Sequence, residues 1–121
     1  MLNLDTHVLI DALRGELSAA ERKLLSSERW SISAIVLWEL SKLVQLGRVD
    51  LDLDAPELSQ ALGAIHVWPL DFAVCRQSTR LDFRSDPADE LIAATSLVHG
   101  VPLVTRDRRI RKSKQVPLAR M

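Results

Sequence analysis

The sequence contains almost no cysteine: Cys75 is the only one among 121 residues. A single cysteine cannot form a disulfide within the chain, which is typical of proteins from a reducing compartment. No apolar run approaches the roughly 18 residues that a membrane-spanning helix needs. The first residues lack a basic region and a small-residue cleavage site, so we expect a structural element there rather than a signal peptide. These absences predict a cytoplasmic protein without a membrane segment.

Repeats, low-complexity segments and linkers are also missing from the sequence. The length suits one domain, residues 1–121, with a core of its own. Apolar residues make up 47% of the chain and charged residues 26%, which is the balance of an ordinary globular protein.

Charge is balanced overall but unevenly distributed. Residues 105–121 contain seven lysines and arginines against one acid, Asp107, whereas the rest of the chain contains nine basic and fifteen acidic residues. A basic segment at 106–120 can attract a polyanion, and it can equally be a solvated face of the domain. If the polyanion is RNA, the candidate contacts are four arginines: Arg106, Arg108, Arg109 and Arg111.

Apolar runs and turn residues predict strands that alternate with helices. A possible N-cap, Thr6, begins the first helix and Gly15 ends it, while Ser33 caps the helix that follows the second strand. Such alternation favours a parallel sheet covered by helices on both faces. The predicted strands lie at 2–5, at the start of 31–48, and at 66–70, 102–105 and 115–119; the predicted helices lie at 6–15, 18–27, the rest of 31–48, 54–65, 71–81 and 86–100.

Two acids close predicted strands: Asp5 follows the first strand and Asp107 follows the strand at 102–105. In an open parallel sheet the carboxyl ends of the strands line the crevice where ligands bind. If these two strands are neighbours, their backbones are roughly 4.8 Å apart, so we expect the two carboxylates to share one site.

Glu39 falls within the apolar arc of its predicted helix, an arc that runs from Val36 through Leu40 and Leu43 to Leu46. A carboxylate among leucines is costly unless something neutralises it, and no basic residue shares the arc. A bound metal ion or proton uptake would remove this cost, and so would a border position that reaches solvent.

Asp89 stands in the first turn of the helix predicted at 86–100. It can form a capping box behind Asp86 and Pro87, and both acids favour the positive end of the helix dipole. The same helix is apolar nearly all round, so it is expected to be central, with its start opening onto the crevice.

Together these positions predict a cluster of Asp5, Glu39, Asp89 and Asp107. Packed carboxylates raise one another's pKa unless a cation intervenes, and ligands that are all oxygen suit Mg²⁺ or Mn²⁺. Zinc is disfavoured because the histidines are scattered and Cys75 lies mid-helix.

Four motifs, "LNLDTHVLIDAL", "SAIVLWEL", "DPADELIAATSLVHG" and "PLVTRD", resemble in order and spacing the PIN-domain ribonucleases, and among them the VapC-type toxins of bacterial toxin–antitoxin pairs. The resemblance implies a three-layer α/β/α sandwich with a central, mostly parallel twisted sheet. It implies metal-dependent hydrolysis of RNA with the same four acids as metal ligands, and with the hydroxyls of Thr6 and Thr105 close by. It also implies a homodimer and a cognate VapB-type antitoxin.

Glu90 departs from the family pattern, because many relatives have a basic residue directly after the third acid. A fifth carboxylate there is expected to alter metal affinity or the approach of substrate.

Two other functions fit parts of the sequence. A phosphoryl-accepting signalling domain also clusters acids at strand ends, and Asp71 is a candidate acceptor, but such domains usually need adjacent acids after the first strand and a lysine after the last. A catalytically inactive PIN-like binding module is the other, and the complete set of four acids argues against it. Trp38 is predicted to point away from the apolar arc, either toward a partner such as the antitoxin or under a covering helix.

Overall fold

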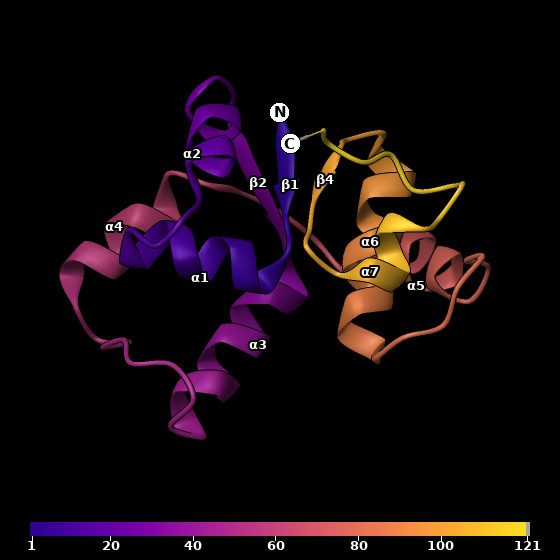
Figure 1. Ribbon diagram of the computed structural model, residues 1–121. Coiled ribbons are helices and arrows are strands. Elements are labelled where there is room, and N and C mark those ends of the chain that lie inside the picture. The colour runs from indigo at the N-terminus through magenta and orange to yellow at the C-terminus, as the bar shows by residue number, and fades with distance from the viewer. Residues whose placement is uncertain (121) are drawn as a thin grey trace.

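The computed structural model describes residues 1–120 and contains a parallel sheet of four strands (Figure 1). Strand β1 (Leu2–Leu4) lies between β2 (Trp30–Ser33) and β4 (Leu103–Val104), and β3 (His66–Trp68) forms the edge beyond β2. Every pairing is parallel, with Leu4 in register with Val104. Parallel strands need crossover connections, and the intervening segments supply them as helices.

Helices cover both faces of this sheet, which gives the three layers predicted from the sequence. Helices α1, α2 and α4 lie on one side and α5, α6 and α7 on the other, while α3 contacts both α1 and α6 (Figure 1). The helices described in residues 1–120 are α1 (Thr6–Arg14), α2 (Ala19–Ser26), α3 (Ala34–Gln45), α4 (Pro56–Gly63), α5 (Phe72–Ser78), α6 (Pro87–His99) and α7 (Arg108–Arg111). None of these helices is long and apolar enough to cross a bilayer.

The core surrounds the central strands β1 and β4, and helix α6 packs against it. Leu2, Leu4 and the whole of β4 are buried. The side chain of Asn3, also fully buried, donates from Nδ2 to Ser96 Oγ at 2.9 Å and to the Ile92 carbonyl at 3.4 Å. This polar link between β1 and α6 sets the position of α6 along the sheet, and so the position of its first turn.

Helix α1 has a capping residue at each end, Asp5 before it and Gly15 after it. Gly15 has φ 70°, a left-handed conformation that favours glycine, and ends α1 as predicted. The prediction that Thr6 is the N-cap was wrong. Asp5 has the extended cap conformation and its carboxylate accepts from Thr6 N, so the Thr6 hydroxyl is free for another partner.

The C-terminal segment differs most from expectation. The strand predicted at 115–119 is reduced to a single bridge between Leu103 and Leu118, flanked by Pro117, which has no amide hydrogen to extend a ladder. Helix α7 was not predicted. It has one turn, and the Asp107 carboxylate holds its start by accepting from Arg109 N at 2.8 Å and Ile110 N at 3.1 Å.

Candidate functional site

A cleft of about 540 Å³ lies at the carboxyl edge of the sheet, and all four predicted acids line it. Asp5 and Asp107 come from the ends of the neighbouring strands β1 and β4, Glu39 from α3 and Asp89 from the first turn of α6. Four segments far apart in the chain therefore meet at one place. The other lining residues are His7, Val8, Asp11, Asp86 and Arg106.

The two predicted hydroxyls hold the acids at the centre of the cleft. Thr105 Oγ1 donates to Asp5 Oδ2 at 2.6 Å and accepts from Asp107 N at 3.0 Å, so one side chain links the ends of β1 and β4. Thr6 Oγ1 donates to Glu39 Oε1, which joins α1 to α3. Asp5, Thr6 and Thr105 are all buried, so these bonds are shielded from competing water.

Asp89 is the acid whose ionisation the cleft changes most clearly. Burial raises the pKa of Asp89 to about 6, and the charges of Asp5, Glu39 and Asp107 add to the increase, although a hydrogen bond from Ser85 Oγ at 2.9 Å opposes it. The capping box considered for Asp89 is not formed, because its carboxylate bonds to Ser85 and the Asp86 side chain makes no capping hydrogen bond. The negative charges of the other three acids therefore favour the protonated form of Asp89.

Glu39 lies half-buried on α3, facing the cleft, rather than inside a continuous apolar arc. The expected arc ends early, because Leu46 is 64% exposed. Trp38 is 56% exposed and points away from the core, as its place on the helix predicted.

The donor set suits a hard cation. The four side chains offer only oxygen, and the second oxygens of Glu39, Asp89 and Asp107 accept no hydrogen bond from residues 1–120. The acids are nevertheless not gathered tightly, since no three Asp, Glu, His or Cys side chains in this part of the chain stand close enough to coordinate one ion as placed. The chemistry fits Mg²⁺ or Mn²⁺, and coordination would require the acids to draw together.

A second group of acids, of which Asp11 lines the cleft, is paired with an arginine of the chain. Arg106 donates from Nε and Nη2 to both oxygens of Glu21, at 2.6 and 2.8 Å, and from Nη1 to Asp11 Oδ2 at 2.6 Å. The Arg106 guanidinium lowers the pKa of Glu21 to about 2 although Glu21 is buried. Sequence reasoning did not find this group. Ser18 and Glu21 have capping-box spacing, but no local pattern predicts a pairing across 85 residues.

The four arginines proposed as RNA contacts have different surroundings. Arg106 is committed to the Glu21 and Asp11 carboxylates, and Arg111 donates to the Thr105 carbonyl at 3.0 Å. Arg108 and Arg109 are exposed, and their side chains make no hydrogen bond or ion pair within residues 1–120. These two remain available to bind a polyanion.

Comparison with known proteins identifies the family of this chain. The model of the PIN domain matches residues 3–115. The chain belongs to the PIN domain family. This PIN domain is 34% identical over 100 residues to Ribonuclease VapC22 of Mycobacterium tuberculosis, an alignment that covers 79% of this chain and 76% of that protein.

Solved structures share the fold of this PIN domain at low sequence identity. A chain of a toxin–antitoxin complex from Klebsiella pneumoniae superposes with a TM-score of 0.74 at 19% identity, covering 96% of this chain and 95% of that one. A chain of VapBC2 from Rickettsia felis, bound to a DNA fragment from the promoter, gives a TM-score of 0.73 at 18% identity, covering 98% of both. The predicted α/β/α sandwich is confirmed.

Proposed function

We propose that this PIN domain is a metal-dependent endoribonuclease that acts as the toxin of a toxin–antitoxin pair. One observation carries the proposal: Asp5, Glu39, Asp89 and Asp107, from four separate segments, line one cleft at the carboxyl edge of the sheet. The similarity to a protein named Ribonuclease VapC22 supports RNA as the substrate.

The residues of the cleft have two proposed roles: some would hold a cation, and others fix the positions of the acids. Asp5, Glu39, Asp89 and Asp107 would hold Mg²⁺ or Mn²⁺, which when bound supplies a water of lowered pKa and stabilises charge at the phosphodiester. Thr105 fixes Asp5 relative to Asp107, and Thr6 fixes Glu39. Exposed Arg108 and Arg109 would bind phosphates of the RNA and position it without reading its bases.

The partner is proposed from the comparisons and from one surface feature. The similar structures include toxin–antitoxin complexes, which supports a VapB-type antitoxin as the cognate inhibitor. The exposed indole of Trp38 is a suitable apolar anchor for it. A homodimer and a cytoplasmic location are also part of the proposal.

Neither alternative function gains support. Asp71, the candidate phosphate acceptor, caps α5 by accepting from Val74 N at 3.0 Å and does not line the cleft. An inactive binding module would not need four acids that repel one another in the same cleft.

The test measures RNA cleavage and cation binding on the same purified protein. Labelled single-stranded RNA should be cut with Mn²⁺ present and remain intact with EDTA. Mn²⁺ should also raise the Tm, because the ion binds the folded cleft and not the unfolded chain, and the increase should shrink in Asp107→Asn but not in Asp71→Asn. RNA left intact at every Mn²⁺ concentration, or equal Tm shifts in the two variants, would contradict the proposal.

A further inference from the structure

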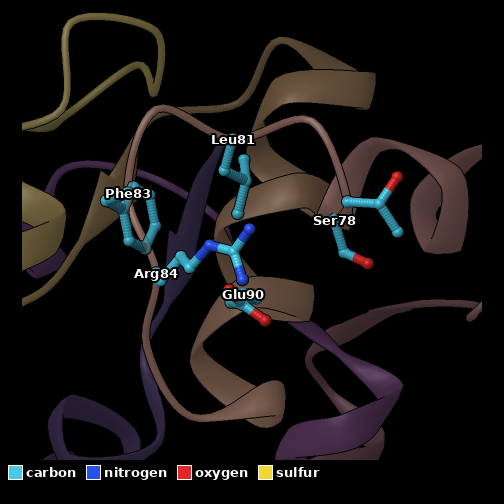
Figure 2. Close-up of a pocket in the computed structure, with 6 residues that line it drawn as sticks. Ser78, Leu81, Phe83, Arg84 and Glu90 are labelled. Carbon is cyan, nitrogen blue, oxygen red and sulfur yellow. The ribbon is translucent and has the colours of Figure 1, made fainter.

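A second pocket lies beside the acidic cleft, between the end of α5, the start of α6 and the loop that joins them (Figure 2). Its volume is about 320 Å³, at the lower end of the roughly 300–1,000 Å³ found for ligand sites. The lining residues are Ser78, Thr79, Leu81, Phe83, Arg84 and Glu90. Glu90 therefore lines this pocket and not the cleft.

One residue connects the pocket to the cleft. Ser85 donates from its backbone N to Glu90 Oε2 at 3.3 Å and from Oγ to Asp89 Oδ2 at 2.9 Å. Asp89 lines the cleft and Glu90 lines the pocket. A ligand in the pocket would therefore lie immediately beside the candidate catalytic acids.

The pocket holds two opposite charges that form no ion pair with each other within 4 Å. Arg84 reaches from the loop toward α6 and Glu90 (Figure 2), yet it forms no ion pair within 4 Å in the described chain. Glu90 Oε1 accepts no hydrogen bond from residues 1–120. Arg106, in contrast, has three donors committed to carboxylates. A free guanidinium and a free carboxylate oxygen on one pocket are available to a ligand that offers both kinds of partner.

The other polar groups of the pocket are acceptors. The Ser78 hydroxyl donates to the Cys75 carbonyl at 2.6 Å and the Thr79 hydroxyl to the Arg76 carbonyl at 2.7 Å, so each hydroxyl oxygen can only accept from a ligand. Leu81 and Phe83 supply apolar surface. The pocket thus combines several hydrogen-bond acceptors, one guanidinium with several N–H donors, and an apolar wall.

We propose that this pocket is a guanine subsite, which binds the base of the RNA nucleotide adjacent to the bond that is cut; the proposal rests on the ribonuclease function proposed above. Guanine presents two neighbouring donors, N1–H and N2–H₂, which match the Glu90 carboxylate. Its O6 and N7 acceptors match an arginine, here Arg84. The base face packs against Phe83, as unstacked bases of single-stranded RNA commonly pack on aromatic side chains.

The other bases match this pattern less well. Adenine and cytosine place a ring acceptor beside their amino group, and that acceptor would face the Glu90 carboxylate. Uracil has a single ring N–H between two carbonyl oxygens. Only guanine offers a carboxylate two adjacent donors while it keeps acceptors for a guanidinium.

Nucleotide binding without catalysis tests the pocket directly. The full-length protein, in EDTA, is titrated by NMR or calorimetry with guanosine, adenosine, cytidine and uridine 5′-monophosphates. We expect guanosine monophosphate to bind roughly 5- to 100-fold more tightly than the others. Glu90→Gln should remove this preference, and Arg84→Gln should weaken guanosine monophosphate most. Arg80→Gln changes an exposed arginine of the same loop that does not line the pocket, so it should bind like the wild type.

A cleavage assay separates this proposal from the ribonuclease assignment. With Mn²⁺, an RNA of mixed sequence should be cut mainly next to guanines, and Glu90→Gln should cut at changed positions. Cleavage without base preference, or an unchanged pattern in Glu90→Gln, would overturn the guanine subsite and leave the ribonuclease assignment intact. Selective binding of guanosine monophosphate with no cleavage of any RNA would support the pocket and overturn the ribonuclease assignment.

Discussion

Two groups of carboxylates lie in or next to the cleft, and they differ in whether a basic side chain offsets their negative charge. Glu21 and Asp11 share the guanidinium of Arg106, which lowers the pKa of Glu21 to about 2. Asp5, Glu39, Asp89 and Asp107 have no such partner, and the pKa of Asp89 rises to about 6. The first group is complete within the chain and contributes to the fold. In the second group no basic side chain of residues 1–120 pairs with the acids, which is why we propose it as the group that holds a cation.

The largest expected effect is on RNA cleavage, and it should follow a change in the four acids that have no arginine partner. Asp5→Asn should lower the rate of RNA cleavage by roughly 10²–10³-fold, because it removes one of the carboxylates that would hold the cation, which stabilises the charge that develops at the phosphodiester. The fold should persist, since the amide oxygen can still accept from Thr6 N, and the amide nitrogen can donate to Thr105 Oγ1 instead of accepting from it. Cleavage rates and circular dichroism spectra of the same preparation measure both. Near wild-type cleavage, with contaminating nuclease excluded by the Mn²⁺-free control, would mean that the acids are not the reactive site.

A change in the Arg106 group should instead lower the stability of the fold. Arg106→Met leaves the buried Glu21 carboxylate without its donor, so the free energy of unfolding should fall by about 2 kcal/mol. Urea unfolding measures it, and Arg14→Met is the matched control, because Arg14 pairs with Glu16 on the surface. If both variants lose equal stability, the Arg106 group is no more than a surface pairing.

Stability against pH should distinguish the groups by sign. Asp89 has a folded pKa of about 6 against an ordinary value of 3.8, so the folded state binds its proton more tightly and stability is lost as pH rises through 6. Glu21 has a folded pKa of about 2 against 4.5, so its contribution is present above pH 4.5 and is lost as pH falls through 2.

Two variants measure this difference in protein stripped of divalent ions. Asp89→Asn should raise the Tm at pH 7.5 by about 4 °C and have a smaller effect at pH 4. Glu21→Gln should lower the Tm at pH 7.5 and matter less at pH 2.5. Parallel curves of Tm against pH for both variants and the wild type would show that neither carboxylate is perturbed as described.

The two groups also differ in how far sequence could predict them. Asp5 and Asp107 follow buried strands, and Asp89 begins an apolar helix, so the crossover rules of parallel sheets are enough to place them at one edge. All four acids do line one cleft there. The Arg106 pairing with Glu21 depends on how the 106 loop lies over α2, which local periodicity does not encode. The same holds for the second pocket, since Arg84 and Glu90 become neighbours only through the course of their loop.

The smallest expected effect concerns Arg108 and Arg109, which are exposed and whose side chains have no partner in residues 1–120. Replacing Arg108 and Arg109 together by Gln should weaken RNA binding several-fold and reduce the slope of log affinity against log salt by about 2, because each phosphate contact releases counterions. Exposed Arg22 and Arg48, changed together to Gln, remove the same charge elsewhere on the surface and should leave the slope unchanged. Both binding curves are measured in EDTA, so that cleavage does not interfere. Equal slopes for the two double variants would mean that net charge alone attracts RNA. A reduced slope only for Arg108 and Arg109 places the phosphates at α7, directly after Asp107, and so orients the RNA across the four acids that lack a cation of their own.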